Sequence, residues 1–228
     1  MISTNIPDEG SSSVSKVLQP GNHVVTVNSV KLDAPPYNRN AYSIVLLLEG
    51  PDMGEGFEGF FFNKENESLG RHKGQVAYVK TSQYAYSDAT TKTGIVINRD
   101  TEIVKALKNL CRALNCLDWF QAEDMKHETV ESLVEKFNQD KPFTGNKLRC
   151  CIGGSEYTNK QGYTNFDLYF VKPGRGQYAF ESADTPVTES KVVDFDPDTH
   201  IRRKKVETVA SFGEGVTTSS SVGDDFQI

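Results

Sequence analysis

The 228-residue sequence contains no apolar run that approaches the roughly 20 residues of a membrane-spanning helix. Its longest apolar run extends from Ile44 to Leu48, which is the length of a strand. Residues 1–19 are polar and Ser-rich, and they lack the basic start and apolar stretch of a signal peptide. We therefore expect a protein without a membrane partner, located in the cytoplasm where it is made.

The sequence also lacks the motifs that carry common enzyme chemistry. It has no Gly-rich phosphate loop and no nucleophile motif. The four cysteines (Cys111, Cys116, Cys150 and Cys151) and the four scattered histidines match no zinc-ligand spacing. We expect reduced, mostly buried thiols, no metal or cofactor, and no enzymatic activity.

The net charge of −6 hides a strong segregation of charge along the chain. Residues 71–112 carry eight basic and three acidic residues, and residues 141–178 carry six basic and two acidic residues. Residues 113–140 and residues 179–228 each carry a net charge of −5. Chance clumping of surface charge is one reading. The other is an anion-binding surface, because only the two basic segments among these four contain tyrosines.

The pattern of apolar residues predicts three strands, a helical insertion, and then two or three more strands. Strands are expected at 23–30, 42–49 and 57–63, and again at 147–152 and 163–171. The segment 75–86 reads as a strand or a mixture of strand and helix, and as a strand it would place Tyr78, Lys80, Tyr84 and Tyr86 on one face. Helices are expected at 100–117, capped by Asp100 or Thr101 and ended by Asn115, and at 128–138.

This order gives a mainly β fold with a helical insertion, in the α+β class. Three strands, a helix and two strands fit an OB-like five-stranded β-barrel, and a β-sandwich with a helical excursion is the alternative. We expect a flexible leader at 1–19 and a nucleic-acid-binding domain at 20–180, with its helical insertion at about 100–140. Trp119 and Phe120 are expected to anchor the pair of helices.

Residues 181–228 are expected to form a largely disordered acidic tail, because they offer few large apolar side chains to offset the entropy of ordering. Within the tail, residues 192–195 can dock on the domain. The basic cluster at 202–205 is either a solvated charge run or an auxiliary phosphate contact. The chain ends in Asp224, Asp225, Phe226, Gln227 and Ile228, an acidic-apolar tip suited to a basic-rimmed pocket on a partner protein.

Taken together, these patterns resemble phage-type single-stranded DNA-binding proteins with an OB fold. The resemblance is carried by Pro20 to Val24, by Glu49 to Gly54 followed by Phe57 to Phe62, by the helix at 102–114, by the strands at 145–152 and 163–170, and by the tip. It covers roughly residues 20–172 plus the tip, and its motifs are soft patterns of strands and turns. The tip departs from the familiar bacterial form, which has more acids and ends in proline and phenylalanine, and this leaves its partner open. The resemblance implies coating of DNA during replication, recombination or repair, in the host cytoplasm if the source is a bacteriophage.

Such a protein would bind DNA in a cationic groove with aromatic side chains stacked on the bases. The expected stacking residues are Tyr78, Tyr84, Tyr86, Tyr157, Tyr163 and Tyr169. The expected phosphate-binding residues are Arg71, Lys73, Lys80, Lys92, Lys147, Arg149 and Lys160. The expected partner-binding residues are Asp224, Asp225, Phe226 and Ile228, which would recruit replication or recombination proteins.

Other readings stay open at this point. A β-rich phage structural or adaptor protein can also carry a disordered tail, and a β-rich module can bind another protein through the tip alone. Each tyrosine could instead pack half-buried in the fold, and each lysine or arginine could simply be solvated. RNA binding and homo-oligomer formation are also compatible with the sequence.

Overall fold

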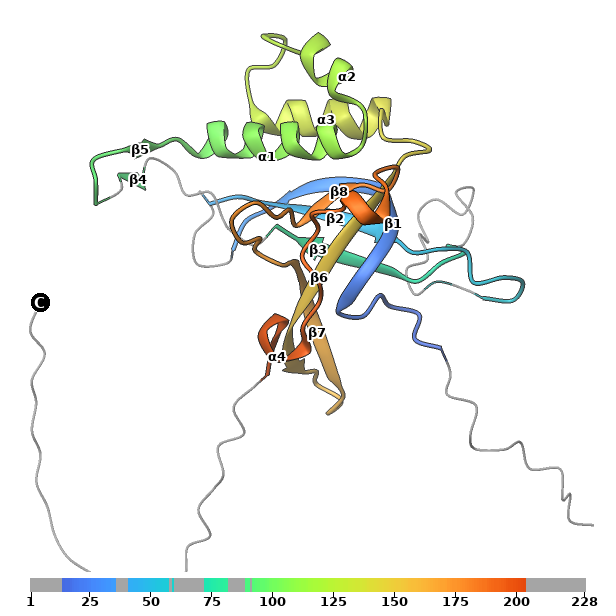
Figure 1. Ribbon diagram of the computed structural model, residues 1–228. Coiled ribbons are helices and arrows are strands. Elements are labelled where there is room, and N and C mark those ends of the chain that lie inside the picture. Colours follow the sequence, from blue (N-terminus) through green and yellow to red (C-terminus); the bar gives the residue numbers. More distant parts are fainter. Residues whose placement is uncertain are drawn as a thin grey trace, which may run out of the picture.

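A computed structural model describes residues 14–35, 41–57, 59, 72–81, 89–90 and 92–203. Within these residues the protein is mainly β, with a mixed sheet and a few helices (Figure 1). Most of the strand predicted at 57–63, the end of the segment 75–86 and the chain after Arg203 lie outside the described residues. Within the described part of the chain, no helix has the length and apolar character needed to span a bilayer.

The first strand, β1 (Gly21–Asp33), is long and changes partner along its length. Its first half pairs with β6 (Lys147–Thr158), and its second half pairs with β2 (Ser43–Glu49). The register shifts between Val27 and Ser29, which is the kind of irregularity that bends and twists a strand. This bend lets one strand join two neighbours that diverge from each other.

The strands close into a ring. β2 pairs with β3 (Val76–Lys80), β3 pairs in parallel with β7 (Thr164–Phe170), β7 pairs with β6, and β6 returns to β1. The third strand of the ring is therefore β3. Because all the other pairings around the ring are antiparallel, the sheet is mixed. The short strands β4 (Ala89–Thr90) and β5 (Val96–Ile97) form a separate two-stranded sheet.

Three helices follow β5 and form a layer above one end of the ring (Figure 1). They are α1 (Arg99–Ala113), α2 (Leu117–Ala122) and α3 (Val130–Asp140). The cap of α1 is Asn98, whose side chain accepts a hydrogen bond from the Thr101 amide, so the predicted caps Asp100 and Thr101 lie inside the helix. Asn115 has a φ of 53°, a left-handed conformation that confirms its predicted place at the helix end.

The helices and the ring share one hydrophobic core. Leu107 and Leu110 of α1 and Phe137 of α3 are fully buried together with Leu46 and Leu148 of the strands. Trp119 packs edge-on against Phe137 with ring centroids 5.2 Å apart, and its indole N–H donates to Asp140. Trp119 thus links α2 to α3, and Phe120 is also partly buried against the shared core, as expected for the anchoring pair Trp119 and Phe120. All four cysteines are buried and free.

The packed part of the chain extends about twenty residues further than the domain end expected at 180. β8 (Phe180–Ser182) and β9 (Ile201–Arg202) add to β6, and between them lie a 3₁₀ turn, η2 (Val187–Glu189), and the short helix α4 (Pro197–His200). Val192 and Val193 are buried against Cys151 and Val171, with Phe195 beside them. This small apolar cluster offsets the ordering cost of an otherwise polar segment, and it confirms the predicted docking of residues 192–195.

Candidate nucleic-acid interface

The outward side of β3 presents a tyrosine and a lysine. Because side chains alternate along a strand, Ala77 and Val79 enter the core while Tyr78 and Lys80 point away from it. Tyr78 is 40% exposed. The predicted face containing Tyr78 and Lys80 is therefore present, while Tyr84 and Tyr86 lie outside the described residues.

A lysine from β1 reaches the same tyrosine. The Lys31 Nζ atom lies 4.1 Å from the centroid of the Tyr78 ring, a cation–π contact. Lys31 and Lys80 are both register partners of Val45, so the two lysines flank the buried β2 strand on its outer side. Lys80 also forms an ion pair of 3.7 Å with Asp33, and both side chains are more than a third exposed. Two cations and an aromatic ring thus share one patch.

The patch continues across the parallel pairing to β7. Lys80 and Tyr169 are register partners, so their side chains leave the sheet on the same side. The Arg202 guanidinium lies 4.8 Å from the centroid of the Tyr169 ring, and the Tyr169 hydroxyl donates to the His200 carbonyl at 3.0 Å. We call the five residues Lys31, Tyr78, Lys80, Tyr169 and Arg202 the tyrosine–cation row.

The hairpin that joins β6 to β7 (Figure 1) carries two exposed tyrosines. Tyr157 is 42% exposed and Tyr163 is 67% exposed, and Lys160 stands between them at the exposed tip. The Asn159 side chain shapes this turn, since its oxygen accepts from the amides of Gln161 and Tyr163, both at 2.9 Å. Counting in steps of two along β6, Tyr157 leaves the sheet on the same side as Gly153, whose register partner is Tyr169.

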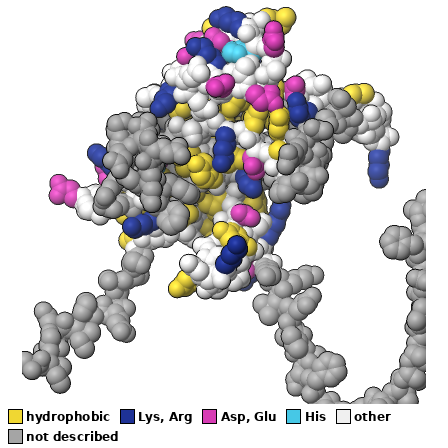
Figure 2. Space-filling model, turned by 180° about the vertical axis from the view of Figure 1, so that it is seen from behind, with side chains coloured by type: hydrophobic (Ala, Val, Ile, Leu, Met, Phe, Trp, Pro, Cys, Tyr) yellow, Lys and Arg dark blue, Asp and Glu magenta, His cyan; other side chains and the backbone are white. Residues whose placement is uncertain are grey.

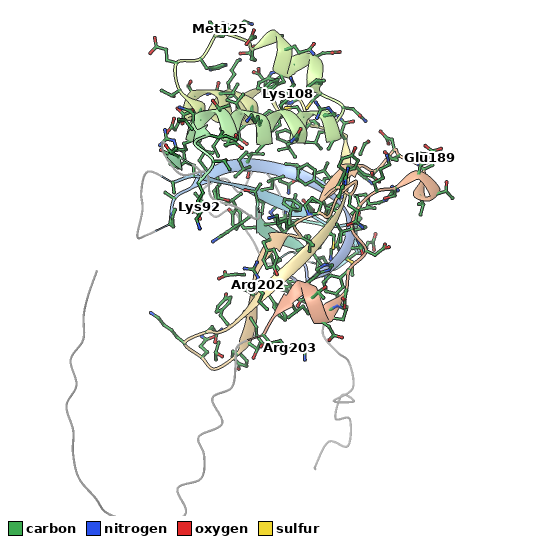
Figure 3. The ribbon with its side chains drawn as sticks, turned by 60° about the vertical axis from the view of Figure 1, so that its left-hand side comes forward. Lys92, Lys108, Met125, Glu189, Arg202 and Arg203 are labelled. Carbon is green, nitrogen blue, oxygen red and sulfur yellow. The ribbon has the colours of Figure 1, made fainter. Side chains whose placement is uncertain are left out.

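Several predicted phosphate-binding residues lie elsewhere. The Arg149 guanidinium is held by the Thr185 carbonyl at 2.9 Å and by Glu181 at 3.3 Å, so it anchors the segment after β8. Lys147 is exposed at the start of β6, and Lys92 lies on the β4–β5 hairpin (Figure 3). Lys73 is exposed in the loop before β3. The structure does not bring these four residues into the tyrosine–cation row.

Some predicted residues lie outside the described part of the chain. They are Arg71, Tyr84, Tyr86, Asp224, Asp225, Phe226 and Ile228. Conversely, the structure adds Lys31 to the residues expected to bind phosphate, and it places Arg202 against the Tyr169 ring. The alternation of β1 could have indicated an outward Lys31, but its contact with Tyr78 depends on the strand register. The sequence places Arg202 in a basic cluster but gives it no position in the fold.

The row is not surrounded by charge of one sign. Asp33 belongs to the patch through Lys80, and Asp167 is exposed on β7 two residues before Tyr169. The face drawn in Figure 2 likewise carries Lys and Arg side chains together with Asp and Glu side chains. An anion would therefore be held by specific side chains of the row more than by a general positive field.

A second feature orders the loop before β3. The Glu49 carboxylate accepts hydrogen bonds from Asn28 (2.7 Å), from the Lys73 amide (2.9 Å) and from the Gly74 amide (3.2 Å), and it pairs with His72 at 2.9 Å. Burial alone raises the pKa of Glu49, but the hydrogen bonds from Asn28, His72 and Gly74 outweigh burial and hold its pKa below the ordinary value. This carboxylate fixes the chain where it enters the strand of Tyr78.

A groove of about 850 Å³ lies between α1 and the segment from Pro173 to Lys191. Arg112 and Lys191 line it together with Glu181 and Glu189, so its charges balance. Among the described residues, no group of three or more His, Cys, Asp or Glu side chains is placed to hold a metal ion.

Comparisons with known proteins give no match, whether with family models, with curated proteins or with solved structures. The interpretation of this surface therefore depends on its own geometry and chemistry.

Proposed function

We propose that this protein binds single-stranded DNA without sequence preference, and that its ring of strands is an OB-type barrel. The order of strands around the ring, β1–β2–β3–β7–β6–β1, supports this architecture. So does the position of the helices, which lie between β3 and β6 along the chain, that is, between the third and fourth ring strands in chain order. OB barrels bind oligonucleotides on the face of their second and third strands and on the loop between their fourth and fifth strands. These correspond here to β2, β3 and the β6–β7 hairpin.

The tyrosine–cation row is the observation that carries the proposal. Single-stranded DNA needs flat surfaces for its bases and cations for its phosphates, and the row supplies both on one side of the sheet. Stacking on a tyrosine contributes about 1–3 kcal/mol per base and tolerates any base. The proposed stacking residues are Tyr78 of the row and Tyr157 and Tyr163 of the β6–β7 hairpin. The proposed phosphate-binding residues are Lys31 and Lys80 of the row and Lys160 of the hairpin.

A comparative titration tests this function. Fluorescein-labelled oligo-dT, the same length of duplex DNA, and oligo-U are titrated with the full chain and followed by anisotropy. We expect saturable binding of oligo-dT and weaker binding of the duplex, because a duplex cannot present unstacked bases. Absence of any anisotropy change with oligo-dT would reject the proposal and favour a structural or adaptor role. Equal or tighter binding of oligo-U would change the proposed substrate to RNA.

The proposal extends to replication, recombination or repair through the C-terminal tip. Asp224, Asp225, Phe226 and Ile228 would dock in a basic-rimmed apolar pocket of a partner, and the acidic tail would compete with DNA when the interface is empty. Truncation after Arg203 should then tighten oligo-dT binding. An unchanged affinity would count against competition by the tail, without touching the proposed role of the row.

A further inference from the structure

Arg202 lies in β9, which pairs with β6 beside the ring. It stands at the end of a segment that was expected to belong to the disordered tail. The segment starts at Lys191, whose carbonyl accepts from the Tyr178 amide at 2.8 Å. Val192 and Val193 then enter their apolar cluster. Asn22 of β1 ties the segment down twice, because its Nδ2 donates to the Val193 carbonyl at 2.8 Å and its Oδ1 accepts from the Phe195 amide at 2.6 Å. We call residues 191–202 the strap.

The second half of the strap is shaped by local capping. The Asp196 carboxylate accepts from the Asp198 amide at 3.0 Å and from the Thr199 hydroxyl at 2.9 Å, which starts the short helix α4. The His200 Nδ1 atom accepts from the Asp196 amide at 2.9 Å. The chain then turns into β9, where Ile201 pairs with Gly154 and Arg202 with Ser155. The strap thus delivers Arg202 to a fixed register on β6.

Tyr169 occupies the space between the strap and β6. An added Cβ on Gly153 would lie 2.8 and 2.9 Å from two atoms of the Tyr169 ring and 2.7 Å from the His200 carbonyl oxygen, so only glycine admits both neighbours. The hydroxyl of Tyr169 is bonded to His200, and the ring carries the Arg202 guanidinium. Tyr169 therefore contacts protein through its hydroxyl, through its ring atoms over Gly153 and through Arg202.

We propose that Arg202 is a phosphate-binding residue of the interface and that Tyr169 is its positioning residue. This inference rests on the proposed function, and it replaces the expected base-stacking role of Tyr169. A guanidinium above a tyrosine ring keeps its N–H donors directed outward for a phosphate, and the ring limits its freedom before binding. The strap consequently belongs to the DNA-binding domain, although it lies in the acidic part of the chain.

The test measures oligo-dT affinity against salt concentration for full-length variants. Each phosphate contact contributes about 0.7 to the log–log salt slope for a single strand. Arg202→Ala should therefore lower the slope by about 0.7 and the affinity roughly fivefold at 0.1 M salt. Tyr169→Leu should cause the same two changes, the double variant should lose no more than either single variant, and Tyr169→Phe should bind nearly as wild type. Lys108→Ala, on the exposed side of α1 and far from Arg202 in Figure 3, is the charge-matched control and should change neither quantity.

The outcomes separate the two proposals. If wild-type protein binds but Arg202→Ala binds with unchanged slope, Arg202 lies outside the interface and the inference fails alone. If Tyr169→Leu weakens binding with an unchanged slope and adds to Arg202→Ala, Tyr169 stacks on a base and its positioning role is rejected. If wild-type protein does not bind oligo-dT, the proposed function itself fails. Urea unfolding of each variant checks that it folds. If Tyr169→Leu does not fold, Arg202→Ala still tests the phosphate-binding role of Arg202, because the Arg202 side chain is exposed.

Discussion

Asn138 of α3 bonds to both backbone groups of Val30 in β1: its Oδ1 accepts from the Val30 amide at 2.8 Å, and its Nδ2 donates to the Val30 carbonyl at 2.5 Å. Val30 pairs with β2 on one side, and the pairing of β1 with β6 ends at Thr26. The amide side chain thus occupies the place of a neighbouring strand where β1 leaves β6. It joins the helical layer to the part of β1 that lies beyond the pairing with β6.

Replacement of Asn138 by alanine should lower the free energy of unfolding by about 2–3 kcal/mol, since two partly buried backbone groups lose their partner. Urea unfolding followed by Trp119 fluorescence measures this loss. Gln139→Ala, at the exposed neighbouring position of α3, should change stability by less than about 0.5 kcal/mol. Equal effects of the two substitutions would show that Asn138 does not join helix and ring.

Gly153→Ala should destabilise the protein by roughly 1–3 kcal/mol, because the new methyl group would collide with backbone at His200 and with the Tyr169 ring. Gly174→Ala is the matched control, since a Cβ there meets mainly the flexible end of the Gln177 side chain. Thermal unfolding of both variants decides the matter. A Gly153→Ala protein as stable as wild type would mean that the strap does not pack on β6 in solution.

The Glu49 carboxylate should make stability depend on acid. Its pKa is lower in the folded protein than in the unfolded chain, so its contribution is complete above the unfolded value and is lost as pH falls through the folded value. The urea midpoint should therefore begin to fall as the pH drops below the ordinary glutamate pKa of 4.5. Glu49→Gln should be less stable at pH 7 and should flatten this fall.

Glu55→Gln, at an exposed turn position, is the control for the acid dependence and should leave the wild-type pH profile intact. If Glu49→Gln retains the full acid-dependent loss of stability, other carboxylates are responsible and the hydrogen bonds to the loop before β3 contribute little.

Tyr78→Leu should weaken oligo-dT binding by about 1–3 kcal/mol, or roughly 5- to 150-fold, through the loss of one stacked base. Tyr178→Leu removes a tyrosine that is similarly exposed (51%) but lines the groove beside α1, and it should leave binding unchanged. Anisotropy titrations at one salt concentration compare the two variants. Similar losses for both would point to a diffuse aromatic surface in place of the tyrosine–cation row.

The elements of this fold follow closely from local sequence patterns. The β-branched run at 23–30, the apolar run at 42–49 and the alternation at 163–171 each predict a strand that the structure contains. The helical spacing of Leu107, Leu110 and Leu114 likewise predicts α1. These signals are strong because one face of each element must enter the core, which fixes the period of its apolar residues.

The candidate site was less accessible to sequence reasoning. Tyr78 and Lys80 could be placed on one face by period alone, but Lys31 meets Tyr78 only because β1 and β3 both pair with β2. Arg149 belongs to a basic segment, yet its partner Glu181 comes from a strand of only three residues. Such contacts depend on the register between strands and on the pairing of very short strands. Neither leaves a periodic pattern of residues in the local sequence.

The affinity for oligo-dT as a function of salt concentration tests the central proposal most directly. Four phosphate contacts, from Lys31, Lys80, Lys160 and Arg202, predict a log–log slope of about −3 for a single strand. A steep decline of this size between about 50 and 300 mM salt is the expected result, because bound phosphates release their counterions. An affinity that stays flat over the same range would contradict a cationic interface for single-stranded DNA.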